Sequence, residues 1–210
     1  CERVPVITEM LTRAACDAKT GPFADFNLSE LEWYELHIAA WLHDCGKVVT
    51  PVHVMDKSKK LETINDRIDT VKARFEVLLR DARLRAYDRE KAGEDAATVA
   101  AELEKETAAL RDDLAFLEKT NFGGEFLARE GQERIKRIAE RTLEMGGVRV
   151  PLLTAEEVQN LSVSRGTLTE KERLVINAHM VHTVNILNAL PFPPQLRRVP
   201  EYATGHHEKM

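Results

Sequence analysis

Apolar residues recur every three or four positions through most of this chain, the spacing that predicts amphipathic helices. One helix is expected near the start of the chain, and it ends before Gly21-Pro22. A second, strongly apolar helix is expected after Ser29, because Ser29 and Glu32 form a capping-box pattern. The second helix runs into the segment His43-Asp44-Cys45-Gly46-Lys47, and we expect Gly46 to end it. No strand pattern of any length is present, so the sequence predicts an all-α fold.

The middle of the chain carries narrower apolar stripes on more polar helices. Two such stripes separated by a loop at Gly93 predict an antiparallel helical hairpin, and a third helix is expected after Asn121. The stripe positions are Ile64, Ile68, Val71, Phe75 and Leu78 in the first helix, Val99, Leu103, Leu110, Leu114 and Leu117 in the second, and Ile135, Ile138 and Leu143 in the third.

The last part of the chain predicts two further helices. Gly146-Gly147 and Pro151 end the preceding block, and Thr169 with Glu172 then forms a second capping-box pattern. We expect one helix to run from there through His179 as far as Leu187. After a proline-rich turn, a last helix is expected from near Pro194 to His206-His207.

Charge is concentrated in the block 61–145, which holds 36 of the 65 charged residues, while all eight prolines lie outside it. A long charged block without proline, between less charged flanks, predicts a helical hairpin inserted into a single domain that spans 1–210. Two interpretations of this arm stay open. It consists of solvated helices held together along one seam, or it binds a partner or a second copy of the chain.

Charge and composition exclude several classes of protein. A net charge of −5 argues against a protein that binds nucleic acid polymers nonspecifically, and no apolar run approaches the length of a membrane span. Three cysteines, Cys1, Cys16 and Cys45, are too few for a disulfide framework and favour a cytoplasmic location. The first residue is not Met and no signal peptide is evident, so we expect a piece of a longer protein with an upstream sensor domain.

Histidines lie at the ends of the expected helices. His43-Asp44 ends one, His179 lies in another, and His206-His207 ends the last. Imidazole and carboxylate groups are the usual ligands of zinc, manganese and iron, and helical bundles build metal sites from facing helices. The pattern therefore predicts a shared metal site. His182 is interpreted as a neighbour of this site, not a ligand.

Three segments resemble the HD-GYP family of the HD phosphohydrolase superfamily. Trp41 to Lys47, followed by Pro51 and Lys57, resembles the family's opening motif. The segment from Gly166 to Arg173, with His179, is similar to its second element, and His206-His207-Glu208-Lys209-Met210 to its third. The resemblance covers roughly 1–57 and 160–210. It implies a helical HD domain with two or three divalent metal ions, iron or manganese, and phosphodiesterase activity on the bacterial second messenger cyclic di-GMP.

The resemblance also assigns roles to single residues. His43, Asp44, His179, His206 and His207 are similar in position to metal ligands, with Asp44 bridging two ions; Lys47 resembles the lysine that contacts a substrate phosphate oxygen. The mechanism that follows is attack of a hydroxide shared by two metal ions on phosphorus. A further ligand histidine of the family would precede Cys1, and its Asp-Gly-x-Gly-Tyr-Pro motif would follow Met210.

Two other functions stay open at this point. A non-catalytic module could keep the metal ligands and signal through the helical arm. A phosphohydrolase of ordinary nucleotides, as in the wider superfamily, would use the same ligands.

Overall fold

The computed structural model describes residues 2–208, which form two compact units. The first unit combines the segment that ends at Pro51 with the segment that begins at Leu174, and the second unit is Val52–Arg173. The charged block 61–145 lies within the second unit. Its description as an insertion into one domain stays a prediction. Cys1, which belongs to the cysteine argument, and Lys209-Met210, which end the third motif, lie outside the described residues.

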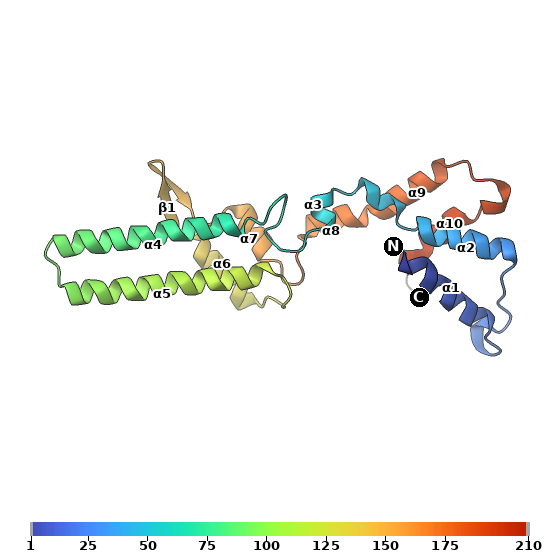
Figure 1. The fold of residues 1–210 in the computed structure, drawn as a ribbon, viewed down its shortest axis with the longest axis horizontal. Coiled ribbons are helices and arrows are strands. Elements are labelled where there is room, and N and C mark those ends of the chain that lie inside the picture. The colour runs from blue at the N-terminus through green and yellow to red at the C-terminus, as the bar shows by residue number, and fades with distance from the viewer. Residues whose placement is uncertain (1, 209–210) are drawn as a thin grey trace. The chain divides into compact units, whose positions relative to one another are not determined.

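Helices build the first unit (Figure 1). Its elements are α1 (Arg3–Cys16), α2 (Glu30–Leu42), the short 3-10 helix η2 (Cys45–Val49), α9 (His179–Ala189), α10 (Val199–Thr204) and η4 (Gly205–His207). The capping box at the start of α2 is confirmed, because the Ser29 hydroxyl accepts from the Glu32 amide and the Glu32 carboxylate accepts from the Ser29 amide. A small core of Ala39, Leu187, Val199 and Ala203 joins α2, α9 and α10.

The prediction that Gly46 ends the second helix is wrong. Helix α2 ends at Leu42, and Gly46 lies within η2 without the left-handed backbone of a terminating glycine. A Cβ on Gly46 would lie 2.1 Å from the His179 carbonyl oxygen. This residue is a glycine because η2 and α9 approach too closely to admit any side chain.

The helix expected to run from Thr169 through His179 is divided in two. The capping box at its start is confirmed, since the Thr169 amide donates to the Glu172 carboxylate at 2.8 Å and the Thr169 hydroxyl accepts from the Glu172 amide. However, α8 (Glu170–Asn177) stops before Ala178, and α9 begins at His179. The expected last helix is likewise divided into η3 (Pro194–Leu196), α10 and η4.

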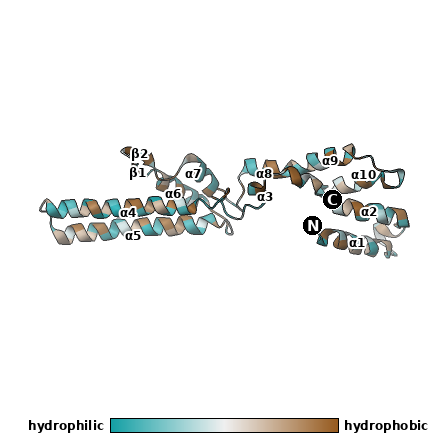
Figure 2. Cartoon of the chain, turned by 45° about the horizontal axis from the view of Figure 1, so that its top comes forward, coloured by the Kyte–Doolittle hydropathy of each residue, from teal (hydrophilic) through white to brown (hydrophobic). Residues whose placement is uncertain are grey.

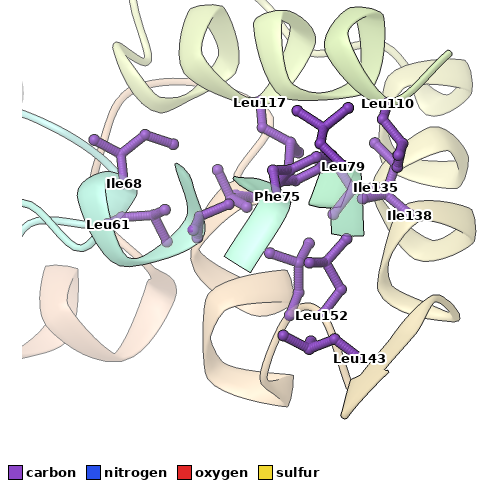
Figure 3. Packing of buried hydrophobic residues seen from close by; sticks show 13 residues of the cluster. Leu61, Ile68, Phe75, Leu79, Leu110, Leu117, Ile135, Ile138, Leu143 and Leu152 are labelled. Atoms are coloured by element: carbon purple, nitrogen blue, oxygen red, sulfur yellow. The ribbon is translucent and has the colours of Figure 1, made fainter. Parts of the chain in front are cut away.

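The second unit contains the expected antiparallel hairpin, α4 (Ile68–Lys91) and α5 (Ala96–Asn121), which lie side by side in Figure 1. Hydrophobic and hydrophilic residues alternate along both helices (Figure 2). Their buried stripe packs against α6 (Arg129–Ala139) and α7 (Ala155–Leu161), and Figure 3 shows this core. The core residues include Val71, Phe75, Leu79, Leu110, Leu117, Ile135, Ile138 and Leu152.

Two of the expected stripe positions are not helical. Ile64 precedes α4 and is 98% exposed. Leu143 is buried, but it lies in strand β1 (Thr142–Met145), which pairs antiparallel with β2 (Val148–Pro151). Gly146 and Gly147 form the turn with φ of +60° and +77°, as a two-residue hairpin requires. The all-α class is confirmed nonetheless, because this hairpin is the one sheet among residues 2–208.

Two buried lysines hold segments of the second unit together. The Lys57 side chain is 1% exposed, and its ammonium donates to Glu172 and to Asn160, both at 2.8 Å. The Lys60 ammonium donates to the carbonyl oxygens of Leu161 and Val163, at the end of α7. Burial without a carboxylate partner lowers the pKa of Lys60 to about 8. No helix in the described part of the chain is long and apolar enough to cross a membrane.

Candidate metal centre

The residues that the sequence singled out as ligands come together in the first unit. His43 follows the last residue of α2, and Asp44 precedes η2. His179 is the first residue of α9, and His206-His207 lie in η4. Three segments that are far apart in the sequence therefore meet at one point.

The Asp44 carboxylate is at the middle of this cluster. One oxygen, Oδ2, lies 3.1 Å from Nε2 of His43. The other, Oδ1, lies 3.3 Å from Nε2 of His179 and 3.6 Å from Nε2 of His206. His207 joins through its Nε2, 3.3 Å from Nε2 of His179. The ligand atoms of His179, His206 and His207 lie within 4.8 Å of one another.

Three of the imidazole rings are oriented by the same local contact. In each, Nδ1 donates to the backbone carbonyl three residues earlier: His43 to Ala40 at 2.7 Å, His179 to Ile176 at 2.5 Å, and His206 to Ala203 at 2.7 Å. A carbonyl oxygen only accepts hydrogen bonds, so Nδ1 carries a proton. The atom that faces Asp44 is Nε2, which bears the lone pair when such a ring is neutral. Metal-binding histidines are held in this way by a partner on the other ring nitrogen.

The electrostatics of the cluster favour a cation. Neutral Nε2 lone pairs and a carboxylate are all electron donors, and the side chains of His43, Asp44 and His179 are 11%, 14% and 3% exposed. Burial lowers the pKa of His206 and so favours its neutral, metal-binding form. Burial alone would raise the pKa of Asp44, but the hydrogen bond from Lys47 and the neighbouring charges hold it below its usual value. Such a donor set fits divalent transition metals.

Lys47 lies beside the cluster, where its ammonium donates to Oδ2 of Asp44. Its side chain is 38% exposed. A cavity of about 510 Å³ between α1, α2 and α10 reaches His43 and His206. The geometry therefore offers a charged lysine and an open approach to the same group of ligands.

Other histidines lie outside this cluster. The His37 ring contacts Glu9 through Nδ1 and accepts from the Trp41 indole at 3.2 Å. His53 belongs to the second unit and is exposed. His182 lies on α9, one turn after His179, and no hydrogen bond of its ring is recorded within residues 2–208.

Sequence reasoning missed one functional contact in the first unit. The Gly46 amide donates to the Thr183 hydroxyl at 3.0 Å, and Thr183 is fully buried. The two residues lie 137 positions apart, and neither carries a group that marks a metal site in a sequence. The glycine of the motif is the one available signal in the sequence, but glycine at that position predicts the end of a helix.

Comparison with known proteins gives one match. Residues 126–210 match a family model described as HD domain. No curated protein and no solved structure matches the chain. The matched range contains His179, His206 and His207 but begins well after His43-Asp44. HD domains bind divalent metals and are generally phosphohydrolases, so the match, together with the cluster around Asp44, supports the assignment of this chain to the HD phosphohydrolase superfamily.

Proposed function

We propose that this protein is a metal-dependent phosphodiesterase of the HD-GYP type that hydrolyses cyclic di-GMP. The observation that carries the proposal is the convergence of His43, His179 and His206 on the two oxygens of Asp44. The motifs around these residues resemble those of the HD-GYP family, and the HD-domain match supports the coarser activity, metal-dependent phosphohydrolysis.

The proposed ligands are His43, Asp44, His179, His206 and His207. Asp44 presents one oxygen to His43 and the other to His179 and His206, so its two oxygens are suited to two different cations. Divalent ions held there, iron or manganese, would polarise a phosphate oxygen and lower the pKa of a water molecule. The hydrogen bonds from Nδ1 to backbone carbonyls keep the three rings in the orientation that this requires.

Lys47 would supply a positive charge to the phosphate group of the substrate. Hydrolysis forms a bond between a water oxygen and phosphorus and breaks the bond from phosphorus to the 3′ oxygen of one ribose, while negative charge builds on the phosphoryl oxygens. The ammonium of Lys47 lies next to Asp44 on a partly exposed side chain, and it can donate to one of these oxygens and offset that charge. Cyclic di-GMP is the proposed substrate, and a partner or a second copy bound to the helical arm stays a proposal.

The test measures bound metal and turnover in the purified protein. We expect iron or manganese to copurify, cyclic di-GMP to be linearised, and Asp44→Asn and His179→Gln each to lose most metal and activity. Lys47→Met should keep the metal and lose turnover. His53→Gln, a change at an exposed histidine outside the cluster, is the matched control.

Each other result points to a different conclusion. Bound metal with no turnover of any phosphoester would favour a non-catalytic binding module. Turnover of nucleoside mono- or triphosphates without turnover of cyclic di-GMP would favour a general nucleotide phosphohydrolase. A wild-type protein that binds no divalent metal would refute the proposal.

A further inference from the structure

Helix η2 needs a hydrogen-bond partner from outside itself. The amide of Lys47 donates within the helix to the Asp44 carbonyl, but the Gly46 amide belongs to the first turn, where amides have no intrahelical acceptor. The Thr183 hydroxyl, from α9, accepts this amide at 3.0 Å. Gly46 and Thr183 are both buried, so water does not supply the bond instead.

This hydrogen bond lies at the closest approach of the two segments. A Cβ on Gly46 would lie 2.1 Å from the His179 carbonyl oxygen and 2.4 Å from the Thr183 amide nitrogen. Both are backbone atoms, which cannot rotate away as a side chain can. The backbone of η2 therefore rests directly on the single turn of α9 that runs from His179 to Thr183.

The contact is coupled to the ligand cluster through the backbone at each end. Gly46 follows Asp44 by two residues, and Thr183 follows His179 by one helical turn. A displacement of η2 along α9 would therefore change the separation of 3.3 Å between Oδ1 of Asp44 and Nε2 of His179. Metal–ligand distances tolerate only about 0.2 Å of variation, so a small displacement would weaken binding.

We propose that Thr183 is a positioning residue that, through its hydroxyl, holds the His43-Asp44 segment in register with His179. The inference rests on the proposed metal centre for its functional meaning. Thr183 itself contacts neither metal nor substrate. Its effect is transmitted by the Gly46 amide, in the same manner as other groups that support ligands from outside the coordination sphere.

The decisive comparison is between Thr183→Ser and Thr183→Ala. Both variants lose the same methyl group, and they differ only in the hydroxyl. Binding of Mn²⁺ is measured by competition with a fluorescent chelator, and the visible spectrum of bound Co²⁺ reports the coordination geometry. We expect the serine variant to bind Mn²⁺ within about threefold of wild type and the alanine variant to bind about 10- to 100-fold more weakly, with an altered Co²⁺ spectrum.

Thr107→Ala is the matched control, because Thr107 is also a buried threonine but lies on α5 in the second unit. It should bind Mn²⁺ like wild type. Equal Mn²⁺ affinity and equal Co²⁺ spectra of the serine and alanine variants of Thr183 would overturn the inference.

A second measurement reads the contact without metal. Hydrogen exchange at the Gly46 amide should remain slow in the serine variant and become fast in the alanine variant. Equal protection in both variants would refute the positioning role, whether or not metal binds. A different result would separate the two proposals. If the wild-type protein binds no Mn²⁺ but the serine and alanine variants still differ in exchange at the Gly46 amide, the proposed function is refuted and the positioning of η2 by Thr183 is supported.

Discussion

Lys60 gives the most quantitative prediction of this structure. Its side chain is 1% exposed, its ammonium donates to two carbonyl oxygens, and no carboxylate pairs with it among the described residues. Because burial disfavours the charged form, the pKa falls from 10.5 in the unfolded chain to about 8 in the fold. Between these two pH values the unfolded chain binds more protons than the folded one, so stability must rise with pH.

The magnitude follows from the shift. At about 1.4 kcal/mol for each pKa unit, the free energy of unfolding gains about 3 kcal/mol between pH 7.5 and pH 10.5. The variant Lys60→Met lacks the titrating group and keeps a side chain of similar length. We therefore expect the difference in unfolding free energy, wild type minus variant, to increase by about 3 kcal/mol over this range, while contributions from other titrating groups cancel.

Unfolding in urea is followed by far-ultraviolet circular dichroism, to which α4 and α5, as the longest helices, make the largest individual contributions. The two tryptophans, Trp33 and Trp41, lie in the first unit, so their fluorescence follows the unfolding of that unit separately. If the difference in unfolding free energy between wild type and variant does not change from pH 7.5 to 10.5, the ammonium is not desolvated. If this difference decreases, the pKa of Lys60 is raised by folding and not lowered.

Three further changes test other parts of the fold. Lys57→Met leaves the partly buried Glu172 carboxylate without its cation, and should lower the stability of the second unit by about 2–4 kcal/mol in urea unfolding; a loss below about 0.5 kcal/mol would contradict the buried pair. Gly146→Ala meets no neighbouring atom but forces an L-residue to φ of +60°, so a cost of about 1 kcal/mol is expected in thermal unfolding, and no cost would argue against this turn. Ser29→Ala removes the cap of α2 and should cost about 1 kcal/mol by tryptophan fluorescence, whereas an unchanged midpoint would show that the cap is not formed.

Hydrophobic spacing located the long helices because an amphipathic helix buries every third or fourth residue. Val71 and Phe75 on α4, and Leu110 and Leu117 on α5, are buried as their spacing predicts. The same spacing failed at Ile64 and Leu143, since it does not show where the backbone leaves the helix. For Leu143 a local signal was present: Gly146-Gly147 can adopt the left-handed turn of a hairpin.

The sequence singles out the residues of the candidate site, but it does not predict the backbone contacts that hold these residues in place. Motif resemblance singles out His43, Asp44 and His179, and the structure places the two histidines beside the Asp44 carboxylate. The break at Ala178, which makes His179 the first residue of α9, has no signal in the helical spacing. The hydrogen bond from Gly46 to Thr183 was equally hidden, because it depends on how closely two segments approach in three dimensions.

The ion pair between Lys57 and Glu172 has a consequence for the order of folding. The two chain segments of the first unit are separated by the whole second unit, Val52–Arg173, and closing so long a loop in a disordered chain is entropically costly. Lys57 and Glu172 are near the two ends of the second unit, and their contact at 2.8 Å brings those ends together. If the second unit folds first, the loop that the first unit must close becomes short, which saves about 2–3 kcal/mol of closure entropy. The folded second unit would then shorten the loop between the two chain segments that carry the ligand cluster. Lys57→Met would therefore slow the folding of the first unit, although Lys57 belongs to the second.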